Sequence, residues 1–239
     1  MGTIIVTGVS RGLGLAISQR LVSDGHKVIG LSRSLSNPYK SLMDDQPGSA
    51  IFVDFDVSEI EMIPERSRRL IAEHKPIFGL VNNAGIGLDG VLATQHRSDI
   101  ERIMATNLLG PILLTKHISR SMLARGQGRI VNVSSIIAST GFHGLSVYAA
   151  TKAGLEGFTR SLSRELGKAG ITVNCVAPGY METDMTIGMR DDKMDAVRRR
   201  APLGLARVED AAAAVSYLLG TDATRITGTI VTVDGGSTA

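Results

Sequence analysis

The feature that most limits the possible folds of this chain is an alternation of short, continuous apolar runs with longer segments of helical periodicity. Seven runs have the length and composition of strands: Thr3–Thr7, Lys27–Ser32, Ala50–Asp54, Ile77–Asn82, Arg129–Ser134, Ile171–Ala177 and Thr229–Val233. Five segments between them have the pattern of helices: Leu13–Ser23, Glu59–His74, Ser98–Leu123, Val147–Lys168 and Val208–Leu219. Strands that are apolar on both faces are typical of parallel sheets covered by helices. The alternation therefore predicts an α/β fold, a doubly wound parallel sheet of about seven strands with helices on both faces.

The chain contains no linker, internal repeat or low-complexity block, so residues 1–239 are predicted to form a single domain. Two segments depart from the regular pattern. Residues 34–49 contain Asn37-Pro38 and Pro47-Gly48, which predict a short crossover helix. Residues 180–204 form a long insertion before the last helix, and we expect this segment to cover a substrate as a lid.

Composition excludes several classes of protein. Hydrophobic residues make up 43% of the chain and the net charge is only +3, with the basic residues dispersed, so we expect no binding to nucleic acid. No apolar run approaches 18 residues and no secretory signal is visible, which argues against a membrane protein or a secreted one. The single cysteine, Cys175, lies in an apolar run and predicts a buried thiol in a reducing cytoplasm. No metal site is predicted.

A glycine-rich turn follows the first predicted strand and opens the first predicted helix. It reads Thr7-Gly8-Val9-Ser10-Arg11-Gly12-Leu13-Gly14. Glycines at this place permit a tight turn and let backbone N–H groups at a helix N-terminus approach a pyrophosphate. The alternative is a glycine-rich turn without a ligand, but its position at the start of a βαβ unit favours a Rossmann-type dinucleotide site.

The second predicted strand ends in Arg33, with no acidic residue nearby. An acidic residue at this place accepts a hydrogen bond from the ribose 2′-hydroxyl, whereas an arginine accommodates a 2′-phosphate. Arg33 and Arg11 together therefore predict NADP(H) rather than NAD(H), unless both merely face solvent. After the third strand, Asp56 and Val57 are predicted to flank an adenine; the alternative is a helix-capping role for Asp56 or Ser58.

The segment after the fifth predicted strand has the outline of a proton-transfer site. Tyr148 and Lys152 are four residues apart on a predicted helix and so share one face. An ammonium held close to a phenol favours the phenolate, which predicts a lowered pKa for Tyr148 and a competent proton donor or acceptor. Ser135, at the end of the strand, is placed to supply a hydroxyl to the same point; Ser134 is the alternative.

These motifs together resemble those of the short-chain dehydrogenase/reductase family over essentially the whole chain. The resemblance is carried by Thr7-Gly8-x-x-x-Gly12-x-Gly14, Asn82-Asn83-Ala84-Gly85, Asn107, Ser135 thirteen residues before Tyr148, Tyr148-x-x-x-Lys152, Pro178-Gly179 and Asp234-Gly235-Gly236. It implies that Tyr148 is the general acid, that Ser135 binds the substrate carbonyl, and that Lys152 holds the nicotinamide ribose. It also implies a proton relay through a water bound by Asn107. The cofactor would be held by Gly8, Ser10, Arg11, Gly12, Leu13, Gly14, Arg33, Asp56, Val57, Asn83, Ala84, Gly85, Tyr148, Lys152, Pro178, Gly179 and Thr183.

Within this family the chain is most similar to bacterial 3-oxoacyl-acyl-carrier-protein reductases, through Gly126–Ser135, Gly170–Gly179, Ala201–Gly204 and the end of the chain. This similarity implies an NADPH-dependent reduction of a ketone to a secondary alcohol, most plainly a 3-oxoacyl thioester of fatty acid biosynthesis. One alternative is a relative that acts on another small alcohol or ketone, such as a sugar, a steroid or a secondary metabolite. Another is an NADP-binding sensor without catalysis, which would not need Asn107, Ser135, Tyr148 and Lys152 together.

The substrate side is less constrained by the sequence. Met181, Met185 and Met189 are spaced as one helical stripe, which fits either a lid over an acyl chain or ordinary packing. An acidic carrier protein is a candidate partner for Arg198–Arg200 or for Arg125 and Arg129, although Ala169 stands where such reductases often have a basic residue. Small residues on the Tyr148 helix, Ala149, Ala150, Ala153, Gly154 and Gly157, predict close pairing of helices between subunits, as in the homotetramers of this family.

Overall fold

The computed structural model describes residues 2–181 and 198–239. Its strands form one parallel sheet in the order β3-β2-β1-β4-β5-β6-β7. Their bounds are β1 (Thr3–Thr7), β2 (Lys27–Ser32), β3 (Ala50–Asp54), β4 (Ile77–Asn82), β5 (Gly128–Val133), β6 (Ile171–Pro178) and β7 (Ile230–Val233). The predicted doubly wound parallel sheet is therefore confirmed.

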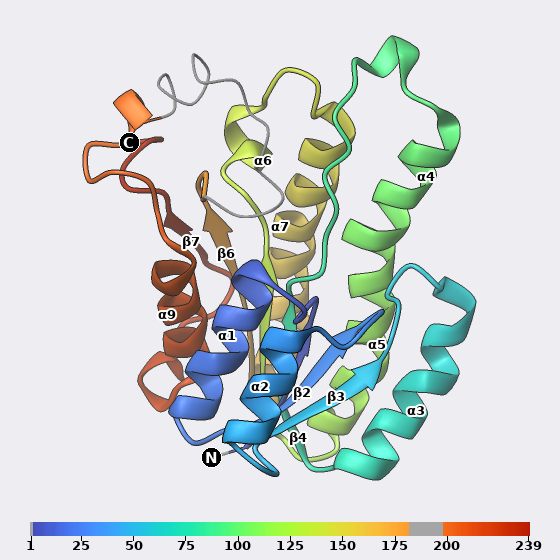
Figure 1. The fold of residues 1–239 in the computed structure, drawn as a ribbon. Helices are drawn as coiled ribbons and strands as arrows, with labels where there is room; N and C mark the ends of the chain where they lie inside the picture. The colour runs from blue at the N-terminus through green and yellow to red at the C-terminus, as the bar shows by residue number, and fades with distance from the viewer. Residues whose placement is uncertain (1, 182–197) are drawn as a thin grey trace.

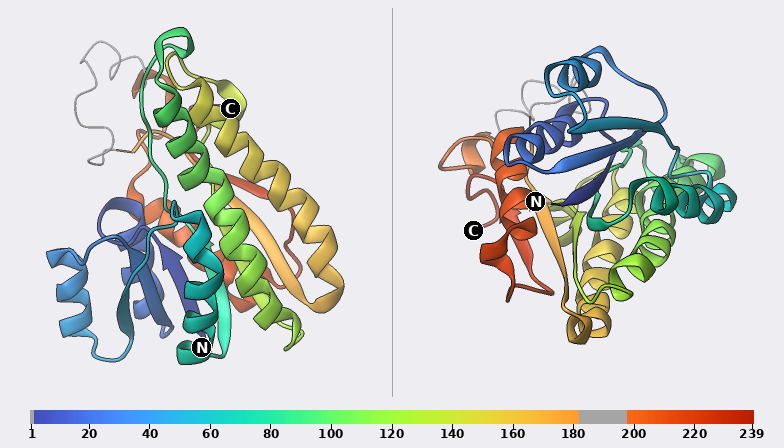
Figure 2. Two further views of the ribbon diagram at one scale, coloured as in Figure 1. Left: turned by 90° about the vertical axis from the view of Figure 1, so that its right-hand side faces the viewer. Right: turned by 90° about the horizontal axis from the view of Figure 1, so that it is seen from below.

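Helices cover both faces of this sheet (Figures 1 and 2). One face is covered by α1 (Gly12–Ser23), α2 (Asn37–Asp45) and α9 (Val208–Leu219), and the other by α3 (Ile63–His74), α5 (Gly110–Leu123) and α7 (Ser146–Leu166). Helix α4 (Arg97–Met104) leads into α5, and a four-residue helix, α6 (Ile137–Thr140), lies between β5 and α7. No helix in the described ranges has the length and hydropathy that crossing a bilayer requires.

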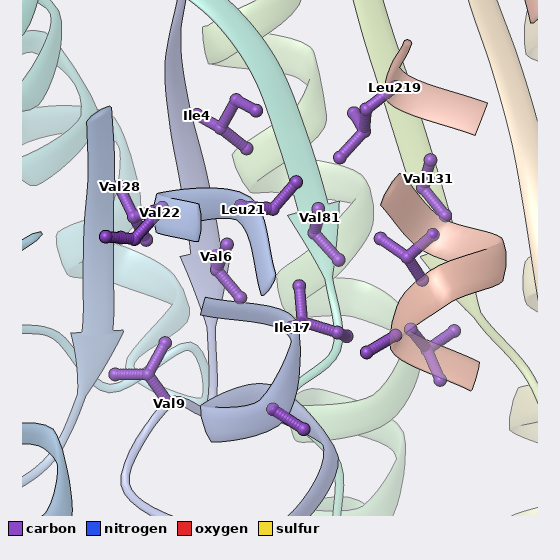
Figure 3. Packing of buried hydrophobic residues seen from close by; sticks show 14 of the residues in the cluster. Ile4, Val6, Val9, Ile17, Leu21, Val22, Val28, Val81, Val131 and Leu219 are labelled. Carbon is purple, nitrogen blue, oxygen red and sulfur yellow. The ribbon is translucent and has the colours of Figure 1, made fainter. Parts of the chain in front are cut away.

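The two cores follow from the alternation of side chains along each strand. On β1, Ile4 and Val6 face the core beneath α1 and α9, whereas Ile5 faces the core beneath α3 and α5. Figure 3 shows the first of these cores, where Ile17 and Leu21 of α1 pack over the strands. Each of these side chains is fully or almost fully buried, and such burial stabilises the fold by about 1.5–3 kcal/mol per side chain.

A buried polar network fixes α5 and α7 against the middle of the sheet. Asn82 on β4 donates to Thr115 on α5 at 2.9 Å and to Asn132 on β5 at 2.8 Å. Asn132 in turn donates to Thr159 on α7 at 2.8 Å. Hydrogen bonds of this kind have fixed geometry, unlike apolar contacts, so the network sets the position of the helix that carries Tyr148.

The predicted strands agree with the structure to within one residue at each end, and the predicted short crossover helix is α2. Three predicted helices are divided. The segment from Val147 to Lys168 is α7 followed by a 3-10 turn at Gly167–Ala169. The segment predicted as one helix from Ser98 to Leu123 is α4, a π-helical turn at Ala105–Leu109, and α5. The segment from Glu59 to His74 begins with a 3-10 turn at Ile60–Met62 before α3. Periodicity alone does not distinguish such turns from a continuous helix.

Candidate active site

Most of the predicted site residues follow the carboxyl ends of strands β1 to β6, at the upper end of the sheet in Figure 1. The glycine turn follows β1, Asn83-Ala84-Gly85 follow β4, Ser135 follows β5 and Gly179 follows β6. Strands β1 and β4 are neighbours in the sheet although they are not consecutive in the chain. Open parallel sheets bind ligands at such a switch point, where the strand order reverses.

The glycine turn has the backbone shape that its sequence predicts. Gly8 and Gly12 have φ angles of +73° and +54°, which residues with a side chain rarely adopt. A Cβ atom on Gly14 would collide with the carbonyl oxygen of Gly8, and it would come within 2.6 Å of the Asn83 amide nitrogen. The first turn of α1 can therefore approach β1 and β4 only because these positions are glycine.

Asn83 ties the end of β4 to the glycine turn. Its side-chain amide donates to the carbonyl oxygens of Thr7 at 2.9 Å and Gly8 at 3.3 Å. The Thr7 hydroxyl accepts from the backbone N–H groups of Asn83 at 3.0 Å and Ala84 at 2.9 Å. Asn83 therefore bridges the two strands on either side of the switch point. Thr7, which the sequence motif includes without a predicted role, holds the same junction.

The end of the site predicted to bind a 2′-phosphate is polar and open. Arg11 and Arg33 are both exposed. The Ser10 and Ser32 hydroxyls are 2.7 Å apart, and Ser36 donates to the Ser10 carbonyl at 2.6 Å, so the ends of β1 and β2 are held together. Arg11 and Arg33 thus lie on adjoining loops that hydrogen bonds hold together, and two arginines so placed suit a phosphate.

The Asp56 carboxylate forms its hydrogen bonds with a neighbouring residue in the chain. Its Oδ1 accepts from the backbone N–H of Ser58 at 2.8 Å and from the Ser58 hydroxyl at 2.7 Å. These bonds close a local turn and do not cap a helix, because the 3-10 turn begins after Glu59 and not after Asp56 or Ser58. The alternative of helix capping is therefore not seen, and adenine binding by Asp56 and Val57 stays a prediction. Val57 beside it is buried.

Three of the four predicted catalytic side chains, Ser135, Tyr148 and Lys152, converge where β5 meets α7. The Lys152 Nζ donates to the carbonyl oxygen of Val133 at 2.8 Å and lies 5.5 Å from the centroid of the Tyr148 ring. Ser135 is 9% exposed and makes a side-chain hydrogen bond with Tyr148. Ser134 instead donates toward the Lys152 carbonyl at 3.2 Å and the Glu156 carboxylate at 3.0 Å. The hydroxyl that lies beside Tyr148 therefore belongs to Ser135.

The protonation behaviour of this pair differs from the sequence prediction. Burial raises the pKa of Tyr148 above its usual value, and the hydrogen bond with Ser135 lowers it only in part. Burial also lowers the pKa of Lys152 to about 8. The predicted lowering of the Tyr148 pKa by Lys152 is therefore wrong for the protein without a ligand, because desolvation disfavours both the phenolate and the ammonium.

Asn107 lies in the π-helical turn and is fully buried. Its Oδ1 accepts from the backbone N–H of Ile86 and its Nδ2 donates to the Ile86 carbonyl, both at 2.8 Å. A Cβ atom on Gly85 would lie 3.4 Å from both the Asn107 Oδ1 and the Lys152 Nζ. Asn107 therefore fixes the loop after β4 beside Lys152, and π turns are frequent at functional sites. The predicted water relay stays a prediction.

The loop after β6 is described only in part. Pro178 ends β6, and a Cβ on Gly179 would come within 2.6 Å of the Asp234 side chain, so the close approach of these segments requires glycine. Thr183, Met185 and Met189, and most of the predicted lid at 180–204, lie outside the described residues; Met181 lies within them.

Two further side chains support the site without having been predicted. Glu156, one turn after Lys152, accepts the hydrogen bond from Ser134. Thr151 donates to the Tyr148 carbonyl at 2.7 Å and lies 3.4 Å from the Asn107 amide nitrogen. The i+4 spacing of Lys152 and Glu156 indicates that Glu156 lies on the same face of the helix as Lys152. Nothing in the sequence distinguished Thr151. No three His, Cys, Asp or Glu side chains gather as a metal site within residues 2–181 and 198–239.

Comparison with known proteins places this geometry in a family. Residues 2–194 match the family model for short chain dehydrogenases. The chain belongs to the short-chain dehydrogenase family. The predicted family is therefore confirmed, and with it the prediction of an oxidoreductase.

Similar proteins of this family match over nearly the whole chain. The 3-oxoacyl-acyl-carrier-protein reductase FabG of Salmonella typhimurium is 40% identical, with 97% of this chain and 95% of that protein covered. The corresponding reductase MabA of Mycobacterium tuberculosis is 36% identical, with coverage of 98% and 92%. One similar solved structure is a gluconate 5-dehydrogenase from Burkholderia cenocepacia in complex with NADP and tartrate. It superimposes with a TM-score of 0.94 at 28% identity, and the match covers 99% of this chain and 95% of the gluconate 5-dehydrogenase chain.

Proposed function

We propose that this short-chain dehydrogenase reduces the 3-oxo group of an acyl thioester to a secondary alcohol with NADPH. The observation that carries the proposal is the 40% identity with FabG over 97% of the chain. The site is consistent with this reaction, because Ser135, Tyr148 and Lys152 converge beside the switch point of the sheet.

The cofactor is NADP(H), and the residues of the cleft fit it. Gly8 and Gly12 have the positive φ angles of a tight turn, and Gly14 lets α1 approach β1 and β4 closely, so backbone N–H groups at the start of α1 can face a pyrophosphate. Exposed Arg11 and Arg33 supply positive charge where a 2′-phosphate is expected, and no acidic residue stands at the end of β2 to favour the 2′-hydroxyl of NAD(H). The NADP bound to the Burkholderia enzyme agrees with this assignment.

When bound, NADPH supplies the hydride that reduces the carbonyl carbon. Tyr148 donates the proton to the carbonyl oxygen, and its raised pKa keeps the phenol protonated at neutral pH, as a proton donor requires. Ser135 donates a hydrogen bond to the same oxygen and stabilises the charge that develops on it. Lys152, held on the Val133 carbonyl, orients the ribose and restores the proton to Tyr148.

The rim of the site suits an apolar chain. Val91, Leu92 and Phe142 are 53%, 57% and 41% exposed, on the loops that follow β4 and β5. These loops are joined by the hydrogen bond from the backbone N–H of Gly90 to the carbonyl of Gly144 at 3.0 Å. Exposed apolar side chains on these joined loops favour a substrate with an acyl chain next to its reacting carbonyl.

A second candidate substrate is a small polyhydroxylated ketone. The likeness to gluconate 5-dehydrogenase, with its TM-score of 0.94, supports this alternative. A sugar acid would need polar groups to replace its hydration, whereas Val91, Leu92 and Phe142 offer none, which is why we favour the thioester.

Steady-state assays with acetoacetyl-coenzyme A and with 5-ketogluconate, each with NADPH, separate the two candidates. We expect NADPH consumption with the thioester and little with the keto acid. Tyr148→Phe serves as the control: we expect turnover to fall by about a thousandfold or more while NADPH affinity stays nearly unchanged, because only the proton donor is removed. Reduction of 5-ketogluconate alone would overturn the proposed substrate, and full activity of Tyr148→Phe would overturn the proposed acid.

Docking of an acyl carrier protein stays part of the proposal, with one correction. Arg129 is only 6% exposed, so it cannot present its charge to a protein partner as the sequence analysis expected. Arg125, Lys168 and Arg198–Arg200 are exposed and are the remaining candidates for an acidic partner. The cytoplasmic location also remains a prediction.

A further inference from the structure

A cavity of about 420 Å³ opens at the end of the sheet where the strands begin, opposite the candidate active site. Its walls come from the residues before β1 and at the starts of β4 and β5, and from the segment that follows α9. The N-terminus marked in Figure 1 lies at this end of the sheet, and the right-hand view of Figure 2 looks toward it from below. Cavities of this volume are of the size that binds small ligands.

The cavity contains a buried arginine without a counter-charge. Arg129 is 6% exposed, and its Nη1 donates to the carbonyl oxygen of Gly128 at 2.8 Å. Its guanidinium lies over the ring of Phe78, 5.6 Å from the centroid, and its Nε has no hydrogen-bond partner. Among the described residues no carboxylate lies within ion-pair distance of it, and burial lowers the pKa of Arg129. A buried charge of this kind gains from a counter-ion of opposite charge.

The other groups that line the cavity are donors, cations and apolar surface. Arg125 is exposed at the rim, and Thr221 and Thr224 supply hydroxyl groups from the turn after α9. His26 stacks on Phe78 with ring centroids 6.4 Å apart, and its buried Nδ1 has no partner. None of the described residues that line the cavity is Asp or Glu.

We propose that this cavity binds the phosphate group of a small phosphate monoester. Guanidinium groups bind phosphate oxygens through charge-assisted hydrogen bonds, and Arg129 and Arg125 offer two such groups from the same wall. The threonine hydroxyls reach the same anion from the facing segment. The volume exceeds that of a phosphate ion, so the ester's organic part lies against Phe78 and Leu219.

To test this proposal, phenyl phosphate is titrated into the full chain saturated with NADP⁺, and binding is measured by calorimetry. Sodium chloride keeps the ionic strength constant. Saturation with the nucleotide occupies the phosphate-binding groups at Arg11 and Arg33, so that any further binding reports another site. We expect saturable binding with one site per chain, and weaker binding of inorganic phosphate. The absence of saturable binding at millimolar phenyl phosphate would overturn the proposal.

Variants assign the site. We expect Arg129→Met to weaken the binding of phenyl phosphate by about tenfold or more and Arg125→Gln by several-fold, while Arg164→Gln, an exposed arginine on α7, leaves it unchanged. NADP⁺ affinity and circular dichroism report whether each variant is folded. If Arg129→Met does not fold, the two variants Arg125→Gln and Thr224→Val test the site in its place. Weakened binding of phenyl phosphate by both variants supports the site. Binding that is unchanged in the folded variants would show that the anion lies elsewhere.

Discussion

Tyr148 and Lys152 show how burial and charge compete within one helical turn. The ammonium lies over the phenol ring, 5.5 Å from its centroid, and is held by the Val133 carbonyl. At this position its charge does not offset the cost of transferring the phenolate from water, so the Tyr148 pKa is raised. Lys152 itself is nearly inaccessible and its charged form is destabilised. Each residue is therefore shifted toward its neutral form, which suits groups that exchange a proton.

The lowered pKa of Lys152 predicts a pH-dependent stability. Its folded pKa is about 8 against an ordinary 10.5, so the unfolded chain binds more protons between these two values, and stability must rise with pH across that window. We expect the wild-type protein to gain up to about 3 kcal/mol in free energy of unfolding relative to Lys152→Met between pH 8 and pH 10.5. Below pH 8 the difference between the two proteins should be constant.

Urea denaturation at a series of pH values measures this difference. Lys116→Met, which replaces an exposed lysine on α5, is the matched control and should show no trend relative to wild type. A constant difference between wild type and Lys152→Met from pH 7 to pH 10.5 would show that the buried lysine titrates normally.

Arg33 predicts the cofactor preference at the same scale. Arg33→Asp places a carboxylate where the 2′-phosphate of NADPH is expected, so like charges repel, while the 2′-hydroxyl of NADH gains an acceptor. We expect the dissociation constant of NADPH to rise by about tenfold or more and that of NADH to change little or fall. Fluorescence titration with both nucleotides measures this, with the exposed Arg68→Asp as control. Equal losses for the two nucleotides would mean that Arg33 does not contact the phosphate.

At the scale of elements, the glycine turn and the π turn place backbone and side chains where a regular helix would not. Gly14 brings α1 against Gly8 and Asn83, and the π turn points Asn107 at the backbone of Ile86. Both elements position groups of the site through close contacts with other strands. Their geometry therefore depends on packing across the switch point rather than on helix propensity.

Gly14→Ala tests the close approach of α1. The added methyl group has no space, so the turn must open and its N–H groups must move away from the pyrophosphate position. We expect NADPH affinity to fall by about tenfold or more, equivalent to about 1.4 kcal/mol. Gly167→Ala is the matched control, because a Cβ there meets nothing within 4 Å. If both variants bind NADPH like wild type, the turn does not require glycine at position 14.

At the scale of the whole molecule, one face of α7 presents small residues to solvent. Ala150, Ala153 and Gly157 are exposed, and a Cβ on Gly157 would meet nothing within 4 Å. Gly154, which was predicted to belong to the same contact, instead faces Leu108 of its own chain, because a Cβ atom added there would lie 3.1 Å from the Leu108 side chain. The predicted helix pairing between subunits therefore rests on Ala150, Ala153 and Gly157.

A homotetramer has a mass of about four times 25.3 kDa, and we expect light scattering to give a value near 100 kDa. Gly157→Glu introduces four buried charges if α7 pairs between subunits, and it should yield smaller species that remain folded. Lys168→Glu, which also introduces a glutamate but at an exposed residue just after α7, is the control. A single 25 kDa species for the wild-type protein would contradict the prediction.

The sequence by itself determined the sheet and the identity of the site motifs. Continuous apolar runs that alternate with helical segments are typical of a parallel sheet covered by helices, so β1 through β7 followed from this pattern. The glycine turn, Asn83, Ser135 and Tyr148 lie at strand ends, and parallel strands bring their carboxyl ends to one edge whatever the details of packing. Local pattern and topology were therefore enough to bring these residues together.

Only the tertiary structure decided how these residues interact. The sequence shows the charge of Lys152 but not the burial that shifts its pKa and that of Tyr148, because desolvation depends on every neighbouring segment. Likewise Arg129 was expected to be a surface charge and is buried at the amino ends of the strands. Glu156 contacts Ser134 after β5, and Thr151 contacts Asn107 between α4 and α5, so their roles depend on contacts across elements. Spacing along the chain fixes which residues meet, whereas solvent exclusion and three-dimensional contact fix their protonation and hydrogen bonding.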